Sequence, residues 1–267
     1  MVVFPNAKIN IGLNVVSKRP DGYHNLETIF YPVSLRDALE MVESEETILT
    51  TSGIEIDGPA DKNLILKAYY LLQQQFNLPP VHFHLHKVIP FGAGLGGGSS
   101  DAAFTLNMLN DYFELKLSPS QLEGFASQIG ADCPFFIRNK PVFATGIGNE
   151  FHDIELDLSE FHIVILKPEF SVGTAEAYKN VTPRKPKFNL PEITRTAICD
   201  WKYLVINDFE KSIVPKHPQI GTLIQLLYDS GASFASMSGS GSAVFGIFRN
   251  SPVIDLDKIP PGIFIYR

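Results

Sequence analysis

A run of glycines near the middle of the chain constrains the fold more than any other feature. Five of the seven residues at 92–98 are glycine, and the run leads into Ser-Ser-Asp-Ala-Ala. Glycine lacks Cβ, so its backbone amides can approach a ligand closely. Ala102, Leu106 and Leu109 then recur at helical spacing. A glycine-rich turn before a helix presents unpaired amides and the helix dipole to an anion, which predicts a phosphate-binding loop.

The loop departs from the two commonest phosphate-binding motifs. A Walker loop needs a lysine directly after its last glycine, and no lysine follows Gly98. Gly92, Gly94 and Gly97 match the dinucleotide spacing G-x-G-x-x-G. However, the acidic residue that should end the next strand would be Glu123, which falls in a predicted helix. The alternative is a flexible loop or tight turn, although a pure linker rarely adjoins so regular a helix.

Composition and charge limit the class of protein. The chain has 267 residues, of which 45% are hydrophobic and 19% charged, which suits one large domain or two modest ones with a sizeable core. A net charge of −7 argues against a general nucleic-acid surface. Cys133 and Cys199 lack paired metal-ligand spacing, and neither a signal peptide nor a membrane span is visible. We therefore expect a cytoplasmic protein with no nucleic-acid or membrane partner.

Hydrophobic periodicity indicates mixed helices and strands. Residues 8–15 alternate strictly between polar and apolar side chains, which predicts a strand with Lys8 and Asn10 on its polar face. Asn63 is a candidate helix cap, and Ser118 opens a capping box. The elements follow no strict βα alternation, which favours an α+β fold over a doubly wound sheet. Further strands are expected at 28–33, 38–42, 81–89, 142–145, 162–166 and 243–248, and helices at 119–130, 171–180, 193–204 and 220–229.

Two pairs of side chains near the N-terminus are candidates for chemistry. Gly12 leaves space beside Lys8 and Asn10. A lysine over a transferring phosphoryl group would neutralise developing charge, whereas the alternative is a solvated strand face. Tyr23 and His24 follow a turn signal and could stack on a nucleobase and bind its edge. An ordinary hairpin turn is the alternative for this pair.

Further candidates lie on either side of the glycine run. Asp132 stands between small residues and a proline, next to two phenylalanines, where a carboxylate could accept a proton from a hydroxyl. Its alternative role is to end a helix by bonding its own backbone. Cys133 is expected to be a small buried hydrophobe. Three histidines, His82, His84 and His86, share one strand face, which could hold zinc or nickel. No nearby acidic or cysteine ligand completes that set, so we expect a solvated face.

Three motifs stand in the order found in the galactokinase, homoserine kinase, mevalonate kinase and phosphomevalonate kinase superfamily, the GHMP kinases. They comprise residues 5–13 with 19–24, residues 90–103, and residues 237–241. The segment 130–136 also resembles the catalytic aspartate segment of one branch of the family, and the likeness covers nearly the whole chain. That branch phosphorylates a small-molecule polyol linked to cytidine diphosphate. The resemblance implies ATP and Mg²⁺ as cofactors.

The resemblance also implies a two-lobed α+β GHMP kinase fold. Residues 1–158 would form the N-terminal lobe, of a kind shared with a ribosomal protein domain and carrying the ATP phosphate loop. Residues 159–267 would form a ferredoxin-like C-terminal lobe. We expect the protein to be a monomer or a weak homodimer.

The family pattern assigns a role to each matching position. Asp132 would accept the proton of the substrate hydroxyl, and Lys8 would orient that carboxylate and stabilise charge. For this to hold, both must converge at the glycine run. ATP would be bound by Pro90, Phe91, Gly92, Ala93, Gly94, Leu95, Gly96, Gly97, Gly98, Ser99 and Ser100, with Asn63 and Lys87 near its nucleoside. The substrate would be bound by Asn10, Tyr23, His24, Thr174, Tyr178 and Gly239. Ser99 or Ser100 could bind Mg²⁺, but the sequence identifies no carboxylate ligand for it.

Two alternative functions remain open at this point. A kinase for homoserine or mevalonate would not need Tyr23 and His24 as a cytosine clamp. A non-catalytic nucleotide-binding protein on the same scaffold would not need both Lys8 and Asp132.

Overall fold

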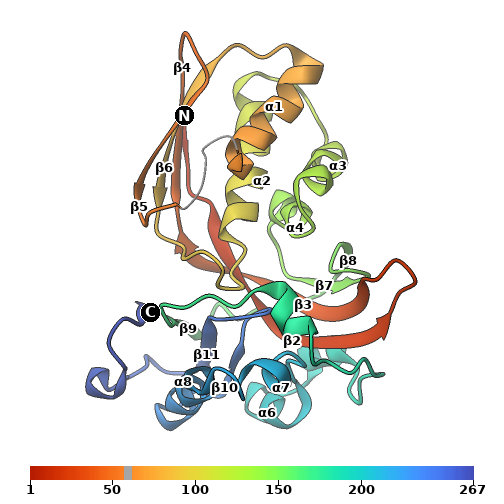
Figure 1. Ribbon diagram of the computed structural model, residues 1–267, viewed down its shortest axis with the longest axis vertical. Helices are drawn as coiled ribbons and strands as arrows, with labels where there is room; N and C mark the ends of the chain where they lie inside the picture. The colour runs from red at the N-terminus through yellow and green to blue at the C-terminus, as the bar shows by residue number, and fades with distance from the viewer. Residues whose placement is uncertain (57–61) are drawn as a thin grey trace. The chain divides into compact units, whose positions relative to one another are not determined.

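The computed structural model describes residues 1–56 and 62–267, and it confirms the α+β class. Its strands form three four-stranded sheets within those residues (Figure 1). Contacts divide the chain into two compact units. Unit 1 comprises Met1–Lys8, Pro32–Phe91 and Gly96–Lys140, and unit 2 comprises Ile9–Tyr31, Gly92–Leu95 and Pro141–Arg267. This division interleaves segments of the chain, so the boundary expected near residue 158 stays a prediction.

Unit 1 packs helices against one sheet. The sheet has the order β1-β4-β6-β5, in which β6 pairs antiparallel with β4 and parallel with β5. Its core joins Leu39 and Phe83 of the strands to Tyr69 and Leu106 of the helices. The strands are β1 (Val2–Val3), β4 (Ala38–Glu43), β5 (Ile48–Gly53) and β6 (Val81–Lys87), and the helices are α1 (Leu64–Phe76), α2 (Gly97–Tyr112), α3 (Pro119–Ile129) and α4 (Cys133–Arg138).

Unit 2 contains the sheet β10-β11-β9-β12 and most of the sheet β2-β3-β7-β8. The N-terminal end of β2 and the C-terminal end of β3 belong to unit 1. The strands are β2 (Asn6–Lys18), β3 (His24–Arg36), β7 (Val142–Thr145), β8 (Glu150–Asp153), β9 (His162–Lys167), β10 (Phe234–Met237), β11 (Val244–Phe248) and β12 (Phe264–Tyr266). The helices are α5 (Thr174–Tyr178), α6 (Trp201–Leu204), α7 (Glu210–Ile213) and α8 (Pro218–Asp229), with 3₁₀ helices η2 (Leu190–Arg195), η3 (Ile198–Asp200) and η4 (Leu256–Lys258).

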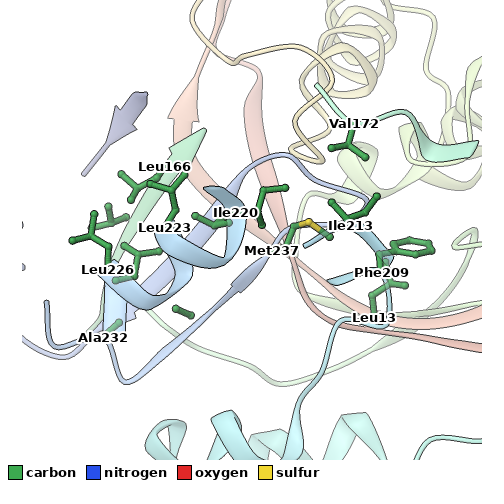
Figure 2. Packing of buried hydrophobic residues seen from close by; sticks show 14 of the residues in the cluster. Leu13, Leu166, Val172, Phe209, Ile213, Ile220, Leu223, Leu226, Ala232 and Met237 are labelled. Atoms are coloured by element: carbon green, nitrogen blue, oxygen red, sulfur yellow. The ribbon is translucent and has the colours of Figure 1, made fainter. Parts of the chain in front are cut away.

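The core of unit 2 is formed by the apolar face of α8 and by neighbouring strands. Ile220 and Leu223 of this helix are fully buried in a cluster that also contains Leu166 and Met237 (Figure 2). The recurrence of apolar residues every three or four positions along α8 produces this face. Removing one such leucine side chain typically costs about 2–5 kcal/mol, so this packing fixes the strands that carry the late glycine turn.

Local sequence signals explain most element boundaries. Asn63 caps α1 by accepting a hydrogen bond from the Ile65 amide at 2.9 Å. Ser118 and Gln121 form the expected capping box at the start of α3. The strand predicted over residues 8–15 lies within β2 and is confirmed. Within the described ranges, no helix has the length and apolar character needed to cross a membrane.

The single helix expected over residues 193–204 is wrong. The chain forms η2, η3 and α6 there, because Thr196 and Ala197 are extended, with ψ of 137° and 138°. The Thr196 carbonyl accepts a hydrogen bond from the indole of buried Trp201 at 3.2 Å. This bond stabilises the extended backbone at Thr196 and Ala197. Sequence periodicity also missed the short strands β5, β8, β10 and β12 and the helix α4.

Candidate functional site

The glycine loop has the backbone of an anion site. Gly92, Gly94 and Gly96 have φ of 57°, 74° and 71°, a region that favours glycine. Gly96 is the N-cap of α2, and its carbonyl accepts the first helical hydrogen bond from the Ser100 amide at 2.9 Å. The amides before Ser100 therefore have no partner within the helix. No acidic side chain lies in the first turn of α2, so nothing there opposes a bound phosphate.

Gly96 also lies against the side chains of Lys8 and Phe136. A Cβ added to Gly96 would lie 2.9 Å from the Phe136 ring and 3.2 Å from Lys8 Cε. Real Cβ atoms essentially never come as close as 2.9 Å, and 3.2 Å is tighter than most Cβ contacts, so a larger residue would displace the ring and press on the lysine. The lysine stem and the start of α2 thus share one small space in unit 1.

Lys8 and Asp132 form an ion pair at this place. Lys8 Nζ lies 3.4 Å from Asp132 Oδ2, and the lysine side chain is 4% exposed whereas the aspartate side chain is 36% exposed. Asp132 occupies the N-cap position of α4, but its side chain makes no capping hydrogen bond. The alternative, in which the Asp132 side chain only hydrogen-bonds to the neighbouring backbone at a helix end, is therefore not observed. A carboxylate beside a buried ammonium, still open to solvent, is suited to receive a proton from a bound hydroxyl.

The cysteine next to Asp132 is not a nucleophile. Burial raises the pKa of the Cys133 thiol to about 11, and the negative charge of Asp132 acts in the same direction. A hydrogen bond with Ser99 opposes this shift only in part. The thiol therefore stays protonated at neutral pH, and the expected role of Cys133 as a small buried hydrophobe is confirmed.

A buried charge cluster lies where β6 leads into the glycine loop. Lys87 Nζ lies 2.5 Å from Asp37 Oδ2 and 2.6 Å from Asp101 Oδ2. Asp37 Oδ1 also accepts hydrogen bonds from the amides of Val88 and Ile89, at 2.6 and 2.8 Å. Asp37 thereby fixes the backbone at the exit of β6.

The two carboxylates of this cluster, Asp37 and Asp101, differ in the hydrogen bonds that they accept. Asp37 accepts three hydrogen bonds, whereas Asp101 Oδ1 has no partner among the described residues. Burial raises the pKa of Asp101 to about 7, and nearby Asp37 adds to the increase while Lys87 opposes it. The pKa of Asp101 is therefore high enough for this carboxyl to bind a proton near neutral pH.

In unit 2, Asn10 and the late glycine turn meet the middle of the glycine loop. The Asn10 amide donates to Ser238 Oγ at 3.1 Å, and Ser238 Oγ donates to the Gly94 carbonyl at 2.8 Å. The Asn10 side chain donates to Thr28 Oγ1 at 3.0 Å. A Cβ at Gly239 would lie 3.2 Å from Asn10 Oδ1. This part of the loop, the opening strand and the late turn are thus held as one assembly.

An aromatic pair in unit 2 contains two of the predicted substrate residues. The rings of His24 and Tyr178 stack with centroids 4.8 Å apart and an interplanar angle of 19°. Tyr178 also packs edge-on against Phe209 at 4.8 Å. Burial, aided by the charge of Lys18, lowers the pKa of His24, so this imidazole is neutral at pH 7. Tyr23, on the adjoining turn, is 62% exposed.

The remaining predicted site residues are placed as follows. Thr174 is the first residue of α5 and is exposed. Asn63 uses its side-chain oxygen to cap α1, and Lys87 is held in the buried charge cluster. Their proximity to a nucleoside stays a prediction. Among residues that the sequence reasoning missed, Asn207 donates to the carbonyls of Met237 and Gly239 at 2.9 and 2.8 Å and so supports the late turn.

The three histidines of β6 are satisfied by hydroxyl groups. His82 and His84 each lie 2.9 Å from Thr50 Oγ1, and His84 and His86 lie 2.9 and 3.0 Å from Ser52 Oγ. In the part of the chain that the structure describes, no group of three or more His, Cys, Asp or Glu side chains could hold a metal ion.

Comparison with family models gives two matches. The model for the GHMP kinases N terminal domain matches residues 63–140, and the model for the GHMP kinases C terminal region matches residues 200–256.

Curated relatives match over nearly the full length. The 4-diphosphocytidyl-2-C-methyl-D-erythritol kinase of Parabacteroides distasonis is 56% identical over 249 residues, covering 93% of this chain and 92% of that protein. The protein of the same name from Bacteroides thetaiotaomicron is 54% identical, covering 100% of this chain and 99% of that protein.

Solved structures agree with these matches. A crystal structure of 4-(cytidine 5'-diphospho)-2C-methyl-D-erythritol kinase has a TM-score of 0.79 at 31% identity, covering 92% of this chain and 90% of that chain. The mevalonate kinase of Methanococcus jannaschii has a TM-score of 0.63 at 16% identity, covering 93% of this chain and 90% of that one, and so shares the fold alone.

Proposed function

This chain belongs to the 4-diphosphocytidyl-2-C-methyl-D-erythritol kinases within the GHMP kinases, and from this we propose its reaction. The protein transfers the γ-phosphoryl group of ATP to the 2-hydroxyl of 4-diphosphocytidyl-2-C-methyl-D-erythritol. Relatives that share more than half of their residues over nearly the full chain support this assignment. The ion pair of Lys8 and Asp132 beside the start of α2 is the observation that carries the mechanism.

The transfer is a displacement at phosphorus. The 2-hydroxyl oxygen attacks the γ-phosphorus, the bond to the bridging oxygen of the β-phosphate breaks, and ADP leaves. Asp132 accepts the proton that the hydroxyl loses. Lys8 holds the Asp132 carboxylate in place and places a positive charge close to the negative charge that develops in the transition state.

The phosphates of ATP fit the start of α2. Its first amides are unpaired, its dipole favours an anion, and the glycines let the backbone approach closely. Mg²⁺ fits here as an ion carried mainly by the phosphates, because it prefers few protein oxygen ligands together with phosphate oxygens and water. Ser100, whose hydroxyl has no partner within the described ranges, could supply one such ligand. When bound, the ion neutralises charge on the β- and γ-phosphates.

The cytidine end of the substrate fits the aromatic residues of unit 2. Tyr178 offers a flat face to cytosine, and neutral His24 can hydrogen-bond to a base edge. We assign Tyr23 and Thr174 to the same nucleoside, and Asn10 and Gly239 to the remainder of the substrate. Homoserine and mevalonate carry no base, so this aromatic set favours the cytidylylated substrate. We further propose that the enzyme works in the cytoplasm as a monomer or weak homodimer.

A substrate panel tests the assignment. ADP release is measured with 4-diphosphocytidyl-2-C-methyl-D-erythritol, with homoserine and with mevalonate at equal concentrations. We expect turnover with the cytidylylated substrate to exceed turnover with the others by at least about 100-fold, since loss of a stacked and hydrogen-bonded base removes a large part of substrate binding. Equal or greater turnover of homoserine or mevalonate would overturn the substrate assignment, and no ADP release with any substrate would favour a non-catalytic protein.

A further inference from the structure

Unit 2 contains a cavity of about 280 Å³ that none of the residues assigned above lines. Its walls come from Asn14 on β2 and from two later segments, of which residues 184, 186–188 and 190 and residues 203–206 and 211 line the cavity. The volume is close to the lower end of the range for small-molecule sites. The wall at 184–190 includes part of the basic, proline-containing stretch Pro-Arg-Lys-Pro-Lys, for which the kinase reaction provides no role.

The walls are attached to the free edge of β2 by backbone hydrogen bonds. The Arg184 amide donates to the Val15 carbonyl at 2.9 Å. The Leu13 amide donates to the Ile206 carbonyl, and the Asp208 amide donates to the Leu13 carbonyl, both at 2.8 Å. Two distant segments are thus anchored side by side along one strand edge. The cavity is therefore a built feature of the fold rather than a gap beside a loose loop.

A buried amide reaches the cavity without a protein partner. Asn14 is 5% exposed and lines the cavity. Its side chain makes no hydrogen bond within the described residues, and its polar atoms are not among those sealed from solvent. An amide withdrawn from bulk water usually finds a hydrogen-bond partner, because an unmade bond costs free energy. The Asn14 amide is thus available to a molecule in the cavity.

The charge of the lining is positive. Arg184, Lys187 and Lys211 line the cavity, and no Asp or Glu does. Asp208, just outside, lies 3.0 Å from the Arg184 guanidinium and 3.9 Å from the Lys211 ammonium. It also accepts the Val15 amide at 3.0 Å. Asp208 thus pairs with two of the three lining cations, Arg184 and Lys211, and the lining as a whole stays positive in a chain whose net charge is −7.

The rest of the lining is apolar. Phe188, Leu204 and Ile206 contribute to it, and Ile206 is 40% exposed. We propose that this cavity binds a small organic phosphate with an apolar body. The phosphoryl oxygens would meet Arg184, Lys187 and Lys211, since several cations suit a dianion and a guanidinium suits phosphate geometry. The body would lie on the apolar wall, where Asn14 donates to or accepts from an ester or hydroxyl oxygen.

The test uses phenyl phosphate as the probe and the intact protein. Backbone amide chemical shifts of Arg184, Lys187 and Phe188 and the side-chain amide shift of Asn14 are followed by NMR during titration. These signals separate this cavity from the glycine loop. A ligand of this size should bind with a Kd of about 1 mM. Lys187→Glu should weaken that binding about ten-fold, because it reverses a charge at the phosphate. Lys185→Glu is the matched control, since Lys185 is exposed and lies outside the lining. This variant should change the Kd of phenyl phosphate by less than about two-fold.

Four outcomes would overturn the proposal. The first is the absence of chemical-shift changes at these residues at about 10 mM phenyl phosphate, and the second is equal weakening of its binding by Lys187→Glu and Lys185→Glu. The third is binding of benzyl alcohol as tight as that of phenyl phosphate, and the fourth is equally tight binding of inorganic phosphate. The last two would remove the anionic or the apolar part of the ligand class. Kinase turnover of Lys187→Glu is measured in parallel and should equal that of the wild type. Failure of the cavity proposal is thus distinguishable from failure of the kinase assignment.

Discussion

Replacing Asp101 with Asn should remove a pH dependence of folding that the buried charge cluster creates. Asp101 is buried and shares the Lys87 ammonium with Asp37, and its pKa is raised from 3.8 to about 7, chiefly by burial. The folded chain therefore binds this proton more tightly than the unfolded chain does. The stabilising contribution is fully present below pH 3.8 and is lost as pH rises through about 7.

The magnitude follows from the difference in pKa. A pKa that is about 3 higher in the folded chain corresponds to roughly 4 kcal/mol over the whole titration. Between pH 5 and pH 8, this linkage lowers the free energy of unfolding by roughly 2–3 kcal/mol. Asp101→Asn resembles the protonated carboxyl and cannot titrate. We therefore expect the variant to be close to wild type at pH 5 and more stable than wild type at pH 8.

Urea denaturation of both proteins at pH 5, 6, 7 and 8 measures this difference, and subtracting the curves cancels the groups that titrate alike in the two proteins. Asp37→Asn is the matched control. Because Asp37 accepts hydrogen bonds from Lys87, Val88 and Ile89, its loss should destabilise the fold by about 3–5 kcal/mol across this pH range. A loss of several kcal/mol by Asp101→Asn at pH 8 would instead show that Asp101 is an ionised and stabilising partner of Lys87, and it would contradict this prediction.

Three further predictions concern the kinase site. Asp132→Asn should fold normally and lose roughly 10²–10⁴-fold in kcat, the usual contribution of a general base, and near-normal turnover would remove Asp132 from that role. Tyr178→Ala should raise KM for the cytidylylated substrate roughly 5- to 100-fold through lost base stacking, whereas Tyr178→Phe should stay near wild type; equal effects in both variants would exclude stacking. Gly96→Ala should raise KM for ATP at least about ten-fold, because its φ of 71° and the nearby Phe136 ring strain any Cβ, and an unchanged KM would show that the loop tolerates the change.

The sequence was most informative where chemistry is local. The glycine run predicted a phosphate-binding turn that leads into a helix, and the structure places α2 directly after it. Ser118 with Gln121 predicted the start of α3. Each of these features depends on residues a few positions apart. Lys8 and Asp132 were singled out by residue type and by family resemblance, but only the structure shows their side chains 3.4 Å apart.

The charge cluster and the cavity depend on contacts between residues far apart in the chain, which no local sequence pattern indicates. No local pattern indicated the partners of Lys87, whose ammonium is held by Asp37, 50 positions before it, and by Asp101, 14 positions after it. The expected place of Lys87 near a nucleoside stays a prediction. The cavity beside Asn14 needs two distant segments along the edge of β2. The helix expected over 193–204 is interrupted at the extended residues Thr196 and Ala197, where the indole of buried Trp201 donates to the Thr196 carbonyl.

Product analysis by ³¹P NMR is the most direct test that the protein phosphorylates the 2-hydroxyl of its substrate with the help of Asp132. The protein is incubated with ATP, Mg²⁺ and 4-diphosphocytidyl-2-C-methyl-D-erythritol, and the spectrum is compared with that of Asp132→Asn. We predict that a new phosphomonoester signal without three-bond coupling to a proton appears together with ADP for the wild type, because the 2-carbon carries the methyl branch and no hydrogen. The signal should appear at least about 100-fold more slowly for the variant. A phosphoryl group on another hydroxyl, or equal rates for the two proteins, would contradict the account.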